Sequence, residues 1–385
     1  MSRHGRVLVA MSGGVDSSVA AGLLHEAGYE VVGVTMKTWD YETSLAGSSV
    51  SRKQSGCCSL DDMNDARAVA VRLGAHHLVL DIRDEFGGWV IDRFQSDYLA
   101  GRTPNPCVLC NTHIKWAALL KRADALGCGH IATGHYAQIR TEGGRWIISR
   151  GVDASKDQSY VLWGVDQAHL ARTLFPLGAL AKTEIRQLAD EMGFEHVAGK
   201  KDSYEICFVP DDDYRGFLRR RTPELAGLEG GRFVHAESGE TLGTHEGYPF
   251  YTVGQRRGLG LALGEPAYVV RIEPETNTVV VGPRSALASQ TLAASGVVWG
   301  KAAELAEERT LWGQIRHRDP GAAAVVRQTG ADSVEAVFET PRSAIAPGQA
   351  AVFYDGDDVV AGGWIDRQPV SRPDEAEEFV ALPML

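Results

Sequence analysis

The strongest constraint on the fold is a glycine turn that joins a short apolar stretch to a segment with helical spacing. Residues 6–10 (Arg-Val-Leu-Val-Ala) are typical of a buried parallel strand, and residues 19–24 carry the apolar spacing of a helix. Between them lies Met-Ser-Gly-Gly-Val-Asp-Ser-Ser, residues 11–18. Gly13 and Gly14 let the backbone turn tightly, so that its N–H groups can surround an anion at the positive end of the helix. The sequence therefore predicts a phosphate-binding turn after a parallel strand.

The turn lacks the lysine of a Walker loop, so another kind of phosphate site is expected. The nearest Walker-like stretch, Gly193 to Lys201, has five residues between its glycines and no Ser or Thr after the lysines. We expect Asp16 to bind Mg²⁺, because a carboxylate repels a phosphate unless a cation lies between them. A lone glycine turn is more often an ordinary connection. However, residues 12–18 resemble the PP-loop of ATP pyrophosphatases, which implies cleavage of ATP to AMP and pyrophosphate and leaves the substrate open.

Composition limits the class of protein. A chain of 385 residues, 44% of them hydrophobic, is expected to form about two or three domains with substantial cores. It has no leader-like start and no run near the roughly 18 apolar residues of a membrane span, so we expect a cytoplasmic protein with no membrane partner. Six cysteines are too few for a disulfide framework and favour reactive or metal-binding thiols.

The net charge of −11 counts against a nucleic-acid partner without excluding one. Part of the acidity lies in residues 371–385, which we expect to form an acidic tail. Each basic cluster, taken alone, is expected to be a solvated face, although together they offer local positive charge. These clusters are Lys200–Lys201, Arg219–Arg221, Arg256–Arg257 and Arg316–Arg318.

The order of strand-like and helix-like segments predicts an α/β fold in residues 1–209, with a doubly wound parallel sheet. Met36 ends the second expected strand, residues 30–36, and ligands bind at such strand ends in open α/β sheets. Helical periodicity nearly vanishes after about Pro210. Short apolar runs between Gly and Pro turns then predict a small β-rich domain over residues 210–285 and an antiparallel β-barrel over residues 286–370.

Cys107 and Cys110 form a C-x-x-C pair after a proline-rich turn. We expect a helix to open at Asn111 or Thr112, which would place Cys110 at its positive end and favour the thiolate. A redox pair, half of a zinc site and a sulfur-handling centre are the alternatives, and no second pair completes a set of zinc ligands. Cys207 alone would be a buried strand cysteine. The remaining cysteines, expected to be bystanders, are Cys57, Cys58 and Cys128.

Seven segments in order resemble the bacterial tRNA-specific 2-thiouridylases (MnmA type). They are residues 12–18, 101–106, 132–136, 156–160, 201–207, 252–260 and 347–354. The resemblance extends from the glycine turn to about residue 370. It implies a PP-loop enzyme that uses ATP and Mg²⁺ to convert the wobble uridine of tRNAs for Lys, Glu and Gln into 2-thiouridine.

The same resemblance implies roles for particular residues. Cys110 corresponds to the nucleophile and Cys207 to the cysteine that carries a persulfide. The implied ATP site comprises Ala10, Met11, Ser12, Gly13, Gly14, Val15, Asp16, Ser17, Met36 and Gly134. The implied contacts to tRNA and its target base are Asn105, Pro106, Cys107, His135, Lys156, Asp157, Gln158, Arg316, His317 and Gln349. Many family members carry Asp at the position of Cys107, where acid–base work is proposed, so this chain departs from the family there.

In the implied reaction, AMP is transferred to the C2 oxygen of uridine and pyrophosphate is released. A persulfide sulfur on Cys207 then attacks C2, and Cys110 resolves the persulfide by forming a disulfide or releasing hydrosulfide. Alternatively, Cys107, Cys110 and Cys207 hold three irons of a four-iron, four-sulfur cluster that delivers the sulfur. The sequence does not separate these routes.

The implied partners are tRNA and an upstream sulfur donor, either a sulfur-relay protein or a cysteine desulfurase, and we expect a monomer. Two other functions stay open at this point. One is a PP-loop synthetase or amidotransferase that acts on a small molecule and needs no paired thiols. The other is a tRNA-binding protein without catalysis. Pyrophosphate release that depends on tRNA would separate all three.

Overall fold

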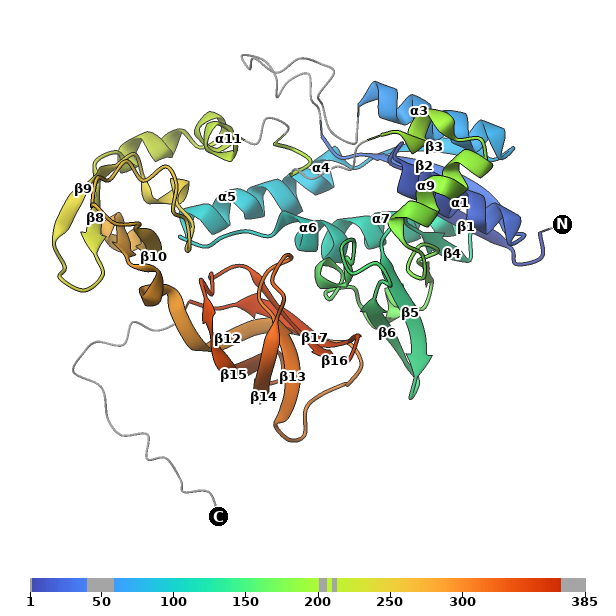
Figure 1. The fold of residues 1–385 in the computed structure, drawn as a ribbon. Helices are drawn as coiled ribbons and strands as arrows, with labels where there is room; N and C mark the ends of the chain where they lie inside the picture. Colours follow the sequence, from blue (N-terminus) through green and yellow to red (C-terminus); the bar gives the residue numbers. More distant parts are fainter. Residues whose placement is uncertain (1, 40–58, 201–205, 210–212, 368–385) are drawn as a thin grey trace.

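The computed structural model describes residues 2–39, 59–200, 206–209 and 213–367. The expected acidic tail and two of the bystander cysteines, Cys57 and Cys58, lie outside these residues. The described chain forms a five-stranded, a four-stranded and an eight-stranded sheet. In Figure 1 the parallel sheet and its helices lie at one side, and the two β-rich parts follow toward the C-terminus.

The N-terminal sheet is parallel, with strand order β3-β2-β1-β4-β7. Val7, Leu8 and Val9 of β1 are fully buried, as expected for a central strand covered on both faces. Leu8 packs with Trp116 of α7 (Trp116–Ala125) on one face, whereas Val7 packs with α1 (Val15–Glu26) on the other. The predicted doubly wound α/β fold is therefore confirmed. Its strands are β1 (Arg6–Ala10), β2 (Glu30–Lys37), β3 (His76–Asp81), β4 (His130–Ala132) and β7 (Thr173–Leu174).

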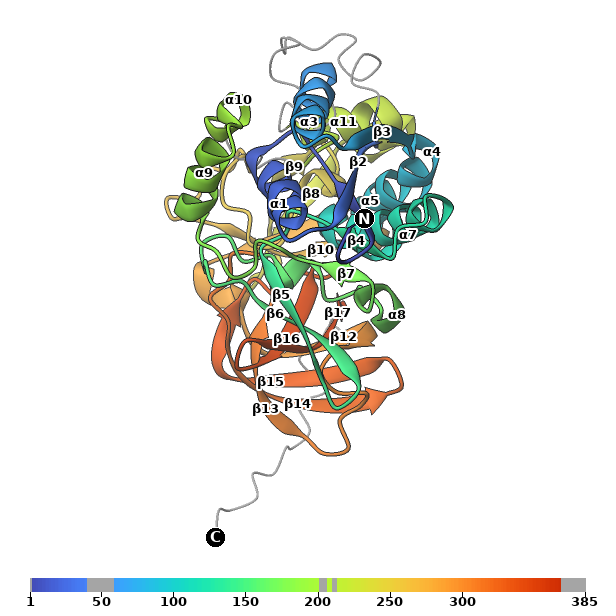
Figure 2. The same ribbon diagram turned by 90° about the vertical axis from the view of Figure 1, so that its right-hand side faces the viewer.

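Helices cover both faces of this sheet (Figure 2). The longer ones are α1 (Val15–Glu26), α3 (Leu60–Arg72), α7 (Trp116–Ala125) and α9 (Lys182–Glu191). A second group, which runs toward the central sheet in Figure 1, comprises α4 (Arg83–Phe86), the π-helical turn Gly87–Ile91, α5 (Asp92–Leu99), α6 (Pro106–Leu109) and the π-helical segment Cys110–Lys115. Two short helices are α8 (Gln167–Leu170) and α10 (Glu195–Ala198).

The C-terminal sheet closes into a six-stranded antiparallel barrel, because β12 pairs with both β15 and β17. Alternate residues of β14 and β15 point inward, which gives the barrel its own core. The predicted antiparallel barrel is confirmed. Its strands are β12 (Ala288–Trp299), β13 (Arg309–Gln314), β14 (Ala322–Gly330), β15 (Ser333–Ser343), β16 (Ala350–Asp355) and β17 (Asp358–Ile365).

A hairpin of the N-terminal region, β5 (Ala137–Glu142) and β6 (Arg145–Arg150), extends the barrel sheet through a pairing of β6 with β17. Asp358 of β17 fixes this junction, since it accepts hydrogen bonds from Ser149 Oγ at 2.6 Å and Arg140 Nη2 at 2.5 Å. The expected plain alternation of strands and helices was wrong at this hairpin. The hairpin joins the first region to the last, so the two are not independent bodies.

The central region is the four-stranded sheet β10-β11-β8-β9, preceded by one helix. Helical periodicity was expected nearly to vanish after about Pro210, and one short α-helix follows there, α11 (Tyr214–Arg221), which buries Phe217 and Leu218 against the helices of the first region. The strands are β8 (Gly231–His235), β9 (Thr241–His245), β10 (Tyr268–Glu273) and β11 (Thr278–Gly282). Short 3-10 turns occur at Ser159–Val161, Pro223–Leu228, Tyr248–Phe250, Pro274–Thr276 and Arg284–Leu287. Within the described residues, none of the helices has the length and apolar character needed to cross a membrane.

Candidate active site

The predicted phosphate turn lies between β1 and α1, and Gly14 is the N-terminal cap of α1. Ser17 Oγ accepts a hydrogen bond from the Ser12 N–H at 3.1 Å, which folds the turn back on the first turn of the helix. Gly13 has φ +74°, and a Cβ there would overlap the main chain of Asp62. Only glycine fits this position, because both its backbone conformation and its close neighbour exclude a side chain. The turn can therefore present its N–H groups to an anion.

Asp16, the expected Mg²⁺ partner, is held by a lysine and a tyrosine. Lys182 Nζ lies 2.7 Å from Asp16 Oδ1 and 2.9 Å from Oδ2, and the Tyr136 hydroxyl donates to Oδ1. Lys182 is the first residue of α9, and its side chain is only 11% exposed. A cation at a helix N-terminus opposes the helix dipole, so local helix preferences do not explain this lysine. Its contact with Asp16 places a positive charge beside the phosphate turn.

A second lysine joins the turn to α3. Lys200 Nζ donates to the Gly13 carbonyl at 2.9 Å and to Asp62 at 2.8 Å, and it also pairs with Asp65. The stretch that ends at this lysine fails as a Walker loop in sequence. Lys200 nevertheless contacts the phosphate turn, although 187 residues of sequence separate it from Gly13.

One cavity of about 860 Å³ opens beside the phosphate turn and extends to the cysteines. Met36 lines it from the end of β2, as expected. Gly134 lines it just beyond β4, where a Cβ would lie 2.8 Å from the Ser17 nitrogen, so the chain after β4 can approach α1 only without a side chain. The other implied ATP-site residues that line it are Ala10, Met11, Ser12, Gly14, Val15, Asp16 and Ser17. Gly13 shapes the turn from behind and is absent from the lining.

The helix that carries the C-x-x-C pair begins earlier than expected. Asn105 is its N-terminal cap, with Oδ1 accepting from the Val108 N–H at 3.4 Å, and Pro106 is its first residue. A capping asparagine followed by proline is a common helix start, so the expected start at Asn111 or Thr112 was wrong. Cys107 therefore lies in the first turn, and Cys110 lies one turn further in, at the start of the π-helical segment. Such segments are frequent at functional sites.

The two thiols differ in their surroundings. Cys110 is buried, whereas the Cys107 side chain is open to the cavity. Desolvation by the surrounding protein atoms raises the pKa of the Cys107 thiol, against the smaller opposing effect of Lys115. Cys107 is thus kept as a protonated thiol at neutral pH.

Cys207 lies in a turn and is half-buried, so it is not the strand residue that its local sequence suggests. The next residue, Phe208, is fully buried among the rings of Phe86, Phe94 and Phe217, at centroid distances of 5.8, 5.1 and 5.3 Å. This aromatic anchor holds the turn against the cavity. Cys107, Cys110 and Cys207 all line it, together with the phosphate turn.

Comparisons with known proteins agree with this arrangement. Three family models match in order: a tRNA methyl transferase HUP domain over residues 5–211, a tRNA methyl transferase PRC-barrel domain over 215–283 and an aminomethyltransferase beta-barrel domain over 289–365. A protein of Salinibacter ruber named tRNA-specific 2-thiouridylase MnmA is 56% identical over all of both chains. The chain belongs to the MnmA family. Relatives of the same name from Amoebophilus asiaticus and Cytophaga hutchinsonii are 58% and 56% identical over 94% and 95% of this chain and 96% and 98% of their own.

The resemblance to MnmA implies that Lys156, Asp157 and Gln158 contact tRNA. Asp157 and Gln158 also accept hydrogen bonds from backbone N–H groups of neighbouring segments. Asp157 accepts hydrogen bonds from the N–H groups of Gly151 and Ser159 at 3.0 and 3.1 Å. Gln158 Oε1 accepts from the Tyr136 N–H at 2.9 Å. All three residues line the cavity. Asp157 and Gln158 therefore hold the loop next to Tyr136. All three residues remain predictions as contacts to tRNA.

The remaining implied MnmA contacts lie in the first region and in the barrel. His135 packs between Trp116 and Phe175, and burial together with the charge of Lys115 keeps its pKa well below the usual value. Gln349, from the barrel, donates to the carbonyl of Pro104 at 3.0 Å and so ties the barrel to the loop before the C-x-x-C pair. His317 lines the same cavity, but Arg316 does not.

The described side chains do not form a complete metal site by themselves, and Mg²⁺ on Asp16 stays a prediction. No group of three or more His, Cys, Asp or Glu side chains among the described residues is arranged to hold a metal ion. The three cavity cysteines therefore share a cavity without forming a cluster site. Both carboxylate oxygens of Asp16 accept hydrogen bonds from Lys182. The sequence alone did not reveal the contact between Lys182 and Asp16.

The sequence reasoning missed Lys182, Tyr136 and Lys200 as parts of the MnmA site. All three line the cavity. Lys182 could have been noticed, because it opens a helix where an acidic residue would be favoured. Tyr136 stands in the family segment 132–136 and Lys200 in a basic cluster, but neither pattern indicated a contact with the phosphate turn.

Proposed function

We propose that this chain catalyses the ATP-dependent 2-thiolation of the wobble uridine in tRNAs for Lys, Glu and Gln. The observation that carries the proposal is that one cavity is lined by both the phosphate turn and three thiols. Its volume of about 860 Å³ suits a nucleotide and an extruded base. The relatives named tRNA-specific 2-thiouridylase support it.

In the first step, the uridine C2 oxygen attacks the α-phosphorus of ATP, and pyrophosphate leaves. The N–H groups of the phosphate turn and the ammonium of Lys182 stabilise the negative charge that builds on the phosphates. Asp16 orients Lys182, and Tyr136 orients Asp16. This step makes AMP the leaving group at C2, where an oxygen alone would leave poorly. No part of it is assigned to a metal ion.

In the second step, the outer sulfur of a persulfide on Cys207 attacks C2, and AMP leaves with the original oxygen. The Cys110 thiolate then attacks the inner sulfur of Cys207, which frees 2-thiouridine and leaves a Cys110–Cys207 disulfide for an external thiol to reduce. Alternatively, Cys110 attacks the persulfide first and releases hydrosulfide, which attacks C2. A sulfur-relay protein or a cysteine desulfurase loads Cys207 in either order.

Cys107 takes the place of the family's aspartate as a proton donor. Its raised pKa keeps the proton on sulfur at neutral pH, so the thiol can donate a hydrogen bond to the target base. The iron–sulfur route is not proposed, because the three thiols share the cavity but, among the described residues, are not arranged to hold a metal ion.

The tRNA lies across all three regions, which we propose as units at residues 1–209, 210–285 and 286–370. Asn105, Pro106 and Cys107 face the target base, which is least costly to unstack in an anticodon loop. The protein works as a cytoplasmic monomer. The contacts proposed around the base are those of His135, Lys156, Asp157, Gln158, Arg316, His317 and Gln349.

The test uses protein purified without air, an unmodified tRNA transcript, ATP and a persulfide donor. We expect pyrophosphate release that requires tRNA, together with 2-thiouridine in the digested RNA. Cys110→Ser and Cys207→Ser should still release pyrophosphate but form no 2-thiouridine. Cys128→Ala, which removes a thiol from the core and not from the cavity, should behave as wild type. Pyrophosphate release with a small molecule in place of tRNA would favour a synthetase, and tRNA binding without pyrophosphate release would favour a binding protein.

A further inference from the structure

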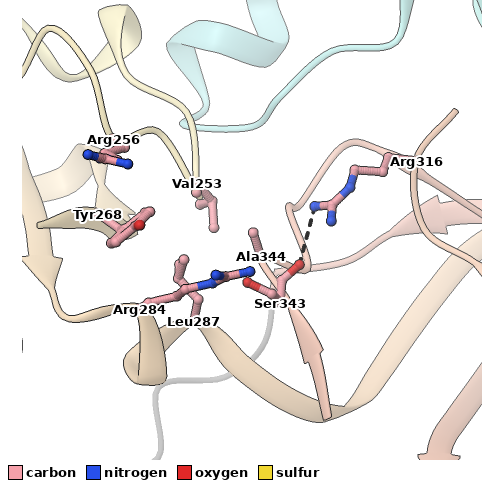
Figure 3. A pocket seen from close by; sticks show the side chains of 9 residues that line it. Val253, Arg256, Tyr268, Arg284, Leu287, Arg316, Ser343 and Ala344 are labelled. Atoms are coloured by element: carbon pink, nitrogen blue, oxygen red, sulfur yellow. Dashed lines mark hydrogen bonds between the residues drawn. The ribbon is translucent and has the colours of Figure 1, made fainter. Parts of the chain in front are cut away.

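A second cavity, of about 410 Å³, lies between the central region and the barrel and is lined by three arginines (Figure 3). Arg256 comes from the loop before β10, and Arg284 opens the 3-10 turn that leads into β12. Arg316 follows β13. We call this the arginine cavity. No acidic side chain appears among the described residues that line it.

The wall opposite Arg256 is held in a tight, unusual conformation. Ala344 has φ 59°, a left-handed conformation that costs free energy for a residue with a Cβ. Its N–H donates to the Leu287 carbonyl at 3.1 Å, which fixes it against the 3-10 turn. Gly254 faces it so closely that a Cβ there would lie 2.7 Å from the Ala344 Cβ. Backbone strain that the surroundings hold in place is typical of ligand sites.

The three arginines keep their positive charge available. Arg316 Nη1 donates to the Ser343 carbonyl at 3.2 Å, which holds the guanidinium at the rim (Figure 3). Within the described part of the chain, none of the three forms an ion pair with a carboxylate. Arg327, on the same barrel, instead pairs with Glu335. The arginine cavity therefore has the charge and the donors to bind an anion.

The turn after β13 connects the arginine cavity with the active-site cavity. Arg316 lines the first, and the next two residues, His317 and Arg318, line the second. An anionic chain that enters the active site past this turn would therefore pass the arginine cavity. A single small anion would gain nothing from this adjacency, whereas a polyanionic strand would.

We propose that the arginine cavity binds a phosphodiester of the tRNA backbone outside the target nucleotide. This proposal rests on the proposed function and adds Arg256 and Arg284 to the implied contacts. The phosphate would fix the position of the RNA strand relative to the active-site cavity. Phosphate contacts set register and orientation in this way without reading sequence.

The test compares Arg256→Ala and Arg284→Ala with Arg327→Ala, a matched control that removes the same charge from an exposed position outside both cavities. The affinity for an unmodified tRNA transcript is measured at several salt concentrations, with thermal melting as a check of folding. Each cavity variant should weaken binding severalfold and make the slope of log affinity against log salt shallower by about one unit. The control should keep the wild-type slope.

Equal affinity and slope for wild type and both cavity variants would overturn the proposal, provided that they melt alike. Stabilisation of wild type, but not Arg284→Ala, by inorganic phosphate, with unchanged tRNA affinity, would assign the cavity to a free anion and would also overturn it. Neither result bears on catalysis. Failure of the proposed function would instead appear as wild-type protein that forms no 2-thiouridine from ATP, tRNA and a persulfide donor.

Discussion

Replacing Lys182 by methionine should separate its role from that of a metal ion at Asp16. The substitution keeps the length of the side chain and removes the charge that lies 2.7 Å from Asp16 Oδ1. Breaking a fully buried ion pair costs about 3–5 kcal/mol, and an exposed pair contributes about 0–1 kcal/mol. The two side chains are 11% and 32% exposed, so this pair falls between those limits. We expect a loss of about 1–2 kcal/mol in the free energy of unfolding.

The effect on activity should be larger than the effect on stability. If Lys182 stabilises charge on the phosphates, Lys182→Met should slow tRNA-dependent pyrophosphate release by about 10²–10³-fold, the loss typical of one such donor. Asp16→Asn should cause a loss of similar size, because it leaves Lys182 without its orienting partner. The double variant should be little worse than either single one, since the two residues act as a unit.

The assay is single-turnover pyrophosphate release over a range of Mg²⁺ concentrations, with Lys121→Met as a control for charge on an exposed face of α7. Wild-type rates in Lys182→Met would refute the assignment of Lys182. If high Mg²⁺ restored the rate of pyrophosphate release in Asp16→Asn, Asp16 would be shown to bind the metal and not to orient Lys182.

Three other perturbations have defined outcomes. Gly134→Ala should weaken ATP binding and destabilise the protein by about 1–3 kcal/mol, because the new Cβ would lie 2.8 Å from the Ser17 nitrogen. Gly129→Ala, which has open space around it, should do neither. Equal ATP affinities of the two variants would contradict this prediction. Cys107→Asp should retain thiolation activity, whereas Cys107→Ala should lower the rate of 2-thiouridine formation by about 10²-fold. Wild-type activity in Cys107→Ala would show that the thiol takes no part in proton transfer. Burial opposes the ionisation of Asp358, but hydrogen bonds from Arg140 and Lys301 outweigh it and lower the pKa to about 2. Its charge therefore adds about 2 kcal/mol of stability above pH 4, which is lost progressively as pH falls through 2. Asp358→Asn should melt lower than wild type at pH 7, and the difference should shrink to about a third at pH 2.5; a pH-independent difference would argue against the ionised contacts.

The parts of the fold that sequence predicted are those set by local pattern. The strand, glycine turn and helix from Arg6 to Glu26 follow one another directly, and β1 and α1 form there. The barrel was likewise visible as evenly spaced short strands. The hairpin β5–β6 has a local signal, the Gly143-Gly144 turn between its strands, and was nevertheless missed. Its pairing with β17, about two hundred residues away, could not be predicted. Long-range pairings of this kind leave no local pattern.

The candidate site shows the same division. Asp16 and Cys110 stand in motifs, so their presence at the cavity could be predicted. The capping residue Asn105 with Pro106 also carried a readable signal, and the start of that helix was still misplaced. Lys200 reaches the turn only through tertiary structure, from the far end of the first region. Local sequence did not show that Lys182 and Tyr136 hold Asp16 in place.

The central claim is that sulfur on Cys207 reaches a uridine activated in the same cavity. It is tested most directly by a single turnover with iron-free protein that carries one radiolabelled persulfide, mixed with ATP and unmodified tRNA and with no other source of sulfur. The account predicts that the label moves from the protein into 2-thiouridine, with one pyrophosphate released for each labelled uridine, and that Cys207→Ser transfers no label. Unlabelled 2-thiouridine from wild-type protein, or 2-thiouridine formed by Cys207→Ser, would contradict it.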